Sequence, residues 1–237
     1  GSLALGALGA ALTYLFDTQK NSLENINTVD VYTNAQFMHL DLNARRNLEL
    51  FETLRGKDKR ASLLWVLDKT KTAMGKRLLR SWLEQPLYNC AAISKRLNAV
   101  DELSQNNILR SDLFELLSDV HDLERLMTRV VYGTAGAREL KSLSFTMARM
   151  PSIRAKMVDC KCNLLCEIYG NIDELEDVSS LIERAIIDDP PISVREGGFI
   201  KEGYSDEVDR LHYDMANGKE IIATIEAKER ERTGIKN

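Results

Sequence analysis

Apolar side chains recur at three- and four-residue steps along most of this chain, which predicts a mostly α-helical protein. An apolar helix rich in small residues is expected over residues 3–20, and a second helix is expected over 43–54. Ser62 opens a short apolar turn. Further amphipathic helices are predicted over residues 91–105, 138–150 and 173–186.

Helix ends can be located from capping residues and proline. Thr72 is a good N-cap for a helix that ends before Pro86. Asp112 and Glu115 have the spacing of a capping box, so one longer helix is expected from there to Val130.

Two short stretches depart from the helical pattern. Residues 37–42 alternate between two sets of side chains, as a short strand does. Residues 192–200 place two apolar runs on either side of a Gly-Gly pair, which predicts a small β-hairpin.

The pattern changes again after Gly203, where a long coiled-coil-like helix is expected from Tyr204 to Arg232. At 1.5 Å per residue this helix would be about 43 Å long. A lone helix cannot bury an apolar seam, so this one needs a partner helix. The expected seam residues are Tyr204, Val208, Leu211, Met215, Ile222 and Ile225.

Two explanations of the unpartnered seam are open. The chain dimerises through it, or the chain is a fragment and the partner helix belongs to the rest of a longer protein. We favour the fragment, because Gly1-Ser2 is typical of a cloning remnant.

Composition allows a full core but gives no strong charge signal. The chain has 237 residues, of which 44% are hydrophobic, and a net charge of −4. No apolar run reaches the roughly 18 residues that span a membrane. Residues 44–80 nevertheless hold eleven Lys or Arg against four acids, a local charge of +7. This segment could meet phosphate or an acidic neighbouring domain, and we favour a solvated or inter-domain face.

Residue types that carry catalysis are sparse. Cys160, Cys162 and Cys166 form C-x-C-x3-C, which is not a familiar zinc spacing, so reduced thiols are expected. The chain has no Walker phosphate loop, no G-x-S-x-G and no H-E-x-x-H. Its three histidines are scattered. No catalytic, cofactor or metal site is therefore assigned.

Five stretches carry a more specific signal. They are LDLNARRNLEL at 40–50, SLLWVLD with TAMGKRLLR at 62–80, DLERL at 122–126, AIIDDPP with GGFI at 185–200, and ERERTGI at 229–235. In order and spacing they resemble the core of bacterial MutS, the DNA mismatch-recognition ATPase. Ala44 stands where the family often has a hydroxyl, a mild departure.

The resemblance implies a division of the chain into three parts. Residues 1–20 resemble the end of a connector domain, 21–203 the core or lever domain, and 204–237 the outgoing arm of the clamp, which is cut off. The family's mismatch-reading domain would precede residue 1, and its ATPase would follow residue 237. The chain itself is therefore expected to be no enzyme and to hold no cofactor, whereas the full-length family uses ATP and magnesium.

The resemblance also implies partners. The lever would link the ATPase to a clamp that contacts the backbone of duplex DNA weakly and without sequence preference. The full-length protein would be a homodimer with a MutL-type partner, cytoplasmic and associated with the nucleoid, with no membrane contact. Glu226 with Arg230 also fits an ordinary i,i+4 ion pair on an exposed helix. The candidate DNA-binding residues are Lys228, Arg230, Arg232 and Lys236.

Two other functions remain open at this point. The chain could be a helical scaffold that dimerises through the 204–225 seam and binds another protein. It could also belong to a MutS-superfamily paralogue that acts in recombination, although the RRNLEL run at 45–50 favours the repair branch.

Overall fold

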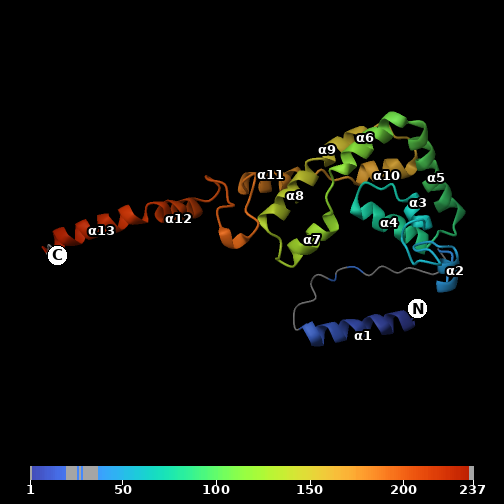
Figure 1. Ribbon diagram of the computed structural model, residues 1–237, viewed down its shortest axis with the longest axis horizontal. Helices are drawn as coiled ribbons and strands as arrows, with labels where there is room; N and C mark the ends of the chain where they lie inside the picture. The colour runs from blue at the N-terminus through green and yellow to red at the C-terminus, as the bar shows by residue number, and fades with distance from the viewer. Residues whose placement is uncertain (1, 20–25, 27, 29–36, 235–237) are drawn as a thin grey trace.

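A computed structural model describes residues 2–19, 26, 28 and 37–234. The described residues are mostly helical and form no sheet, so the prediction of a mostly α-helical protein is confirmed (Figure 1). None of their helices combines the length and apolar character that a membrane crossing requires. The helices are α1 (Ser2–Gln19), α2 (Leu42–Asn47), α3 (Leu63–Leu67), α4 (Ala73–Glu84), α5 (Cys90–Gln105), α6 (Asn107–Ser118), α7 (Leu123–Val131), α8 (Ala137–Met147), α9 (Met150–Lys156), α10 (Asn163–Asn171), α11 (Glu176–Ala185), the 3₁₀ turn η2 (Val194–Glu196), α12 (Asp206–Ala216) and α13 (Gly218–Thr233).

Local side-chain caps fix where several helices begin. Thr72 caps α4 as predicted, because its Oγ1 accepts a hydrogen bond from the amide of Gly75 at 2.9 Å. Ser62 does the same for α3, accepting from the amide of Trp65 at 3.3 Å. α4 ends at Glu84, two residues before the proline.

The buried side chains form two separate cores. The first core lies where α5, α6, α9 and α10 meet, and the second lies between α7, α8 and α11, which Figure 1 shows side by side. Buried residues of the first core are Ala99, Val120, Ile153, Met157 and Leu165. Buried residues of the second core are Ala137, Leu143, Met147, Ile182 and Ile186.

One arginine joins the two cores. Arg77 on α4 donates two hydrogen bonds to the carboxylate of Asp122, at 2.6 and 2.9 Å, and one to Glu124 at 2.8 Å. On the same helix, Met74 packs against the first core, while Leu123 on α7 packs against the second. The bidentate pair therefore fixes α4 relative to α7.

A second carboxylate fixes the loop before α10. Glu102 on α5 accepts hydrogen bonds from the amides of Lys161 and Cys162, both at 2.7 Å. These two backbone bonds hold the pKa of Glu102 below its usual value. The ionised carboxylate thus anchors the loop against α5.

The two predicted β elements are wrong. Of residues 37–42, only Phe37 makes an antiparallel bridge, to Leu87, and Asp41 instead caps α2 by accepting from the amide of Ala44. The predicted hairpin over 192–200 is instead a 3₁₀ turn, η2. Its first turn is capped by the side chains of Ser193, which precedes it, and Glu196, its last residue.

The pairing of residue 200 explains why no hairpin forms. Ile200 bridges to Ile186, far back in the sequence, and the amide of Ile187 donates to the carbonyl of Phe199 at 3.0 Å. The second apolar run is therefore paired with the end of α11 rather than with the first run.

Two predicted helices are shorter than expected. The helix expected over 43–54 stops at Asn47, because Glu49 takes a left-handed φ of 47° and turns the chain. The long helix expected from Asp112 to Val130 is divided into α6 and α7. Asp122 is the N-cap of α7. Asp112 is no cap, because it lies within α6, whose N-cap is Asn106; its carboxylate pairs with Lys156 at 2.7 Å.

The single helix expected over 204–232 is also divided. Asn217 separates α12 from α13, with φ −104° and ψ 14°. Its side-chain amide donates to the carbonyl of Tyr213 at 3.0 Å, a local bond that competes with helix continuation. Figure 1 shows α12 and α13 extending away from the helices of the two cores.

Candidate binding surfaces

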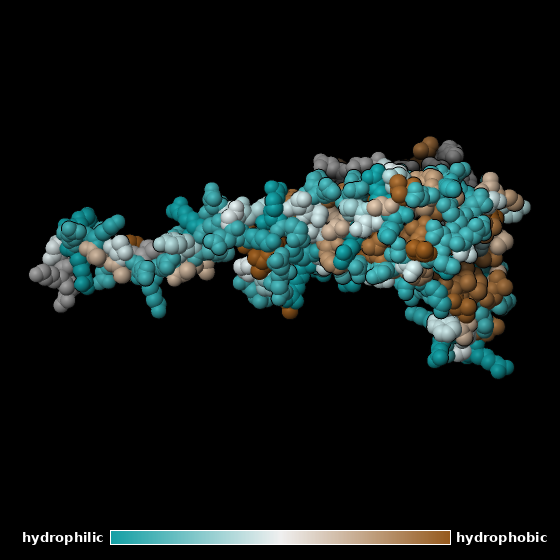
Figure 2. Space-filling model, turned by 90° about the horizontal axis from the view of Figure 1, so that it is seen from above, coloured by the Kyte–Doolittle hydropathy of each residue, from teal (hydrophilic) through white to brown (hydrophobic). Residues whose placement is uncertain are grey.

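The first candidate surface is the apolar seam along α12 and α13. Met215 is 82% exposed and Ile222 is 67% exposed. A row of large apolar side chains in contact with water is unusual and marks an interaction surface. Figure 2 shows this end of the molecule as a narrow projection with apolar atoms among polar ones. The exposed residues of this surface, here called the arm seam, are Tyr204, Leu211, Met215, Ile222 and Ile225.

The candidate DNA-binding cations lie near the far end of the same arm. Arg230 pairs with Glu226 at 2.6 Å, which confirms the predicted i,i+4 ion pair. Arg232 pairs with Glu229 at 2.8 Å. Lys228 makes no ion pair with any described residue. The fourth candidate, Lys236, lies outside the described residues.

Charge along α13 is balanced. Its cations are Lys219, Lys228, Arg230 and Arg232, and its carboxylates are Glu220, Glu226, Glu229 and Glu231. A neutral helix produces little long-range attraction for phosphate, so the arm alone can supply only short-range contacts to a nucleic-acid backbone.

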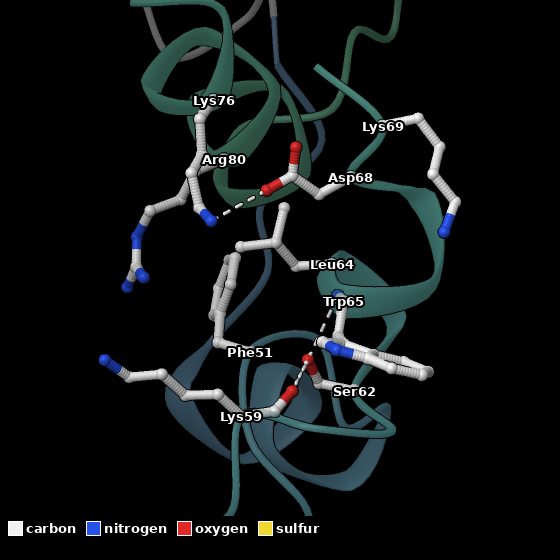
Figure 3. A pocket seen from close by; sticks show the side chains of 9 residues that line it. All are labelled: Phe51, Lys59, Ser62, Leu64, Trp65, Asp68, Lys69, Lys76 and Arg80. Atoms are coloured by element: carbon white, nitrogen blue, oxygen red, sulfur yellow. Dashed lines mark hydrogen bonds and ion pairs between the residues drawn. The ribbon is translucent and has the colours of Figure 1, made fainter. Parts of the chain in front are cut away.

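The second candidate surface is a cleft of about 430 Å³ beside α3 and α4, here called the basic cleft (Figure 3). Ser62, at its base, is fully buried. Trp65 is half exposed at one side of the cleft, and Phe51 lies at the other. The lining residues are Phe51, Lys59, Ser62, Leu64, Trp65, Asp68, Lys69, Lys76 and Arg80.

The one carboxylate of the basic cleft is already neutralised. Asp68 accepts a hydrogen bond from the hydroxyl of Thr70 at 2.6 Å and pairs with Lys76 at 3.0 Å. Both contacts lower the pKa of Asp68, that with Thr70 more strongly. Arg80 pairs with Glu84 at 2.9 Å. Lys59 and Lys69 have no ion-pair partner within the described ranges, so they keep their charge available.

A smaller hollow of about 250 Å³ adjoins the basic cleft, and Lys69 lines both. It is here called the apolar pocket. Lys71 stands over the ring of Phe114, with its Nζ 5.1 Å from the ring centre. The apolar side chains in its lining are Leu103, Leu113, Phe114 and Leu117.

The cysteine cluster shows no sign of activation. Burial is the largest cause of a raised pKa at both Cys160 and Cys162, so their thiols stay protonated at neutral pH. All four cysteines are free. Over the part of the chain that the structure describes, no three His, Cys, Asp or Glu side chains are placed to hold a metal ion.

Sequence reasoning identified the charge of residues 44–80 but not the basic cleft that the structure forms from it. The backbone is left-handed at Lys57 and Ala61, with φ of 52° and 70°, and Lys59 between them lines the same cleft as Lys76 and Arg80 of α4. The residue types do not predict these left-handed turns, because neither residue is glycine. The signal available in the sequence was the run of cations between Phe51 and Trp65.

Comparison with known proteins identifies relatives over nearly the whole chain. The family described as MutS domain III matches residues 43–234. The DNA mismatch repair protein MutS of Acetivibrio thermocellus is 49% identical over 235 residues, covering 99% of this chain and 27% of that protein. The MutS of Alkaliphilus oremlandii is 47% identical over 235 residues, with the same two coverages. That of Lachnoclostridium phytofermentans is 48% identical over 236 residues, covering 100% of this chain and 25% of that protein. The chain thus spans about a quarter of the length of these curated relatives.

Proposed function

The chain belongs to the MutS domain III family, and on that premise we propose that it is the lever of a bacterial DNA mismatch repair protein. Domain III is the helical core region of the family and not its ATPase domain. The lever connects the ATPase to the clamp and passes conformational change between them. It does so as a structural element, without chemistry of its own.

The arm seam is the observation that carries this proposal. Its apolar side chains extend along α12 and α13, away from both cores, with no helix of the described chain beside them (Figure 1). Exposed apolar surface of this kind favours association with a second helix. We expect that helix to be the returning arm of the clamp, supplied by the longer protein.

A lever has to be stiff, and the contacts between α8 and α11 support that property. Ser144 is fully buried, and its hydroxyl bonds to Glu183 on α11 at 3.0 Å. Lys141 pairs with the same Glu183 at 2.7 Å and with Asp188 at 3.2 Å. These bonds fix the helix pair from which the chain continues into the arm.

DNA contact by the arm is expected to be weak and indifferent to sequence. Positive side chains bind the phosphate backbone electrostatically, so their contribution falls as salt rises. Here the guanidinium groups of Arg230 and Arg232 are already engaged by carboxylates. The whole protein is expected to use ATP and magnesium, to act as a homodimer with a MutL-type partner, and to work in the cytoplasm at the nucleoid.

Fluorescence anisotropy with a labelled duplex tests the DNA part of the proposal. We expect weak binding at low salt that is equal for matched and mismatched duplexes and fades at physiological salt. Replacing Lys228, Arg230, Arg232 and Lys236 together by alanine should abolish it, because these cations supply the phosphate contacts.

A matched variant separates charge from shape in this experiment. Glu226→Gln with Glu229→Gln frees the two arginines, so it should tighten binding about tenfold at low salt. If the wild-type chain fails to bind even at low salt, the DNA contacts of the clamp lie outside this chain. Binding that survives the alanine variant would place them on another surface.

A further inference from the structure

We propose that the basic cleft and the apolar pocket together bind an acidic linear segment of a partner protein, one in which an apolar side chain is flanked by carboxylates. The two hollows adjoin at Lys69 and offer both kinds of contact within one short span. No part of this inference depends on the arm seam or on DNA binding by α13.

The cations of the basic cleft are available to a partner. Lys59 and Lys69 are exposed and have no ion-pair partner among residues 37–234. Figure 3 shows Lys59 and Lys69 on different sides of Trp65, whereas the Lys76 ammonium points to Asp68. Asp68 repels little, since Lys76 neutralises it. Carboxylate side chains of a bound peptide can therefore pair with Lys59 on one side of Trp65 and with Lys69 on another.

The apolar pocket supplies what a purely charged surface lacks. Its volume of about 250 Å³ is below the roughly 300–1,000 Å³ of pockets that enclose a drug-sized ligand. It therefore suits one apolar side chain rather than a whole small molecule. Phe114 and Leu117 remain partly exposed at its edge, where such a side chain would cover them.

The same features favour a peptide over nucleic acid. An apolar pocket offers nothing to a phosphate. Both aromatic rings on which bases would stack already have a guanidinium over one face: Arg80 stands over Phe51 at 4.5 Å, and Arg60 stands over Trp65 at 5.9 Å. Residues 44–80 keep a positive charge in the fold even though Arg77 and Arg80 pair with carboxylates outside this segment, and that charge complements an acidic segment and would speed its approach.

The test measures binding of a fluorescein-labelled peptide that carries a Leu-Phe pair flanked by three glutamates on each side. We expect binding that weakens with salt. Lys59→Glu combined with Lys69→Glu should raise the Kd about tenfold or more, because it reverses two contacts. Phe114→Ala should raise the Kd several-fold at unchanged salt dependence, since it removes apolar contact only.

Matched controls make the result interpretable. Arg195→Glu with Lys219→Glu makes the same change of charge away from the cleft, on η2 and α13, and should leave the Kd unchanged. A peptide with lysines in place of the glutamates should not bind. Circular dichroism of each variant shows that it is folded.

Three outcomes would overturn the proposal. The first is no binding of the acidic peptide, or binding that the Lys59/Lys69 variant retains. The second is loss of oligonucleotide binding in that variant while the acidic peptide never binds, which would make the cleft a nucleic-acid surface. The third is a concentration-dependent dimer of the wild-type chain that the same variant does not form, which would make the occupant a second copy of this chain.

Discussion

Ile182→Asp is expected to unfold this chain at ordinary temperatures. Ile182 lies in the second core, 7% exposed, beside Leu143 and Met147. Removing such a side chain costs about 2–5 kcal/mol, and burying an unpaired carboxylate in its place adds several more. The sum is comparable with the roughly 5–15 kcal/mol by which native proteins are stable. Thermal unfolding followed by circular dichroism should show no cooperative transition.

The neighbouring residue is the matched control. Leu181 lies on the same helix, α11, but is 46% exposed. Leu181→Asp should keep a cooperative transition within a few degrees of wild type, because its carboxylate stays in water. Equal damage from both substitutions would show that α11 does not pack as described.

Asp122→Ala should have the largest effect among the polar positions. Asp122 accepts two bonds from Arg77 and caps α7 by accepting from the amide of Arg125 at 3.3 Å. Loss of the cap costs about 1 kcal/mol, and loss of a partly exposed ion pair up to about 1 kcal/mol more. The thermal midpoint should fall by about 4–8 °C.

The difference in thermal midpoint between wild type and Asp122→Ala should depend on pH if the ion pair with Arg77 causes it. The hydrogen bonds from Arg77 are the largest cause of a lowered pKa at Asp122. The stabilisation is therefore fully present above the unfolded-state pKa of about 3.9 and is lost as pH falls through the lower folded-state pKa. The difference in thermal midpoint between wild type and Asp122→Ala should be constant from about pH 7 to 5 and should become smaller below about pH 4. A gap independent of pH would show that the ion pair contributes nothing. Arg77→Lys should reproduce part of the loss, since lysine cannot form the bidentate pair.

Helices and family were predictable from the sequence, and non-local pairings were not. Helical periodicity and the cap at Thr72 depend on neighbours a few residues away, so they survive in any context. The motif order across residues 40–235 identified the family, which the match over 43–234 confirms. The bridge from Ile186 to Ile200 depends on residues that meet only in the folded chain, and so a hairpin was wrongly predicted.

The candidate binding residues divide in the same way. The apolar seam could be read from its spacing. The four candidate cations of the arm came from the family resemblance and stay predictions, as do the boundaries at residues 20 and 203. The break at Asn217 was missed, because a side-chain bond to Tyr213 competes locally with an otherwise continuous pattern. The basic cleft was missed because it depends on left-handed turns at Lys57 and Ala61, which their residue types do not predict.

We propose that the arm seam packs against a helix supplied by the rest of a longer protein. The thermal midpoint of Ile222→Asp, measured beside wild type and Ile182→Asp, tests it most directly. Ile222 is 67% exposed on α13, so its replacement should leave the midpoint of the two cores within about 1–2 °C of wild type. A fall of many degrees, or the loss of the cooperative transition that is expected for Ile182→Asp, would show that the arm already has its partner within this chain and would contradict the account.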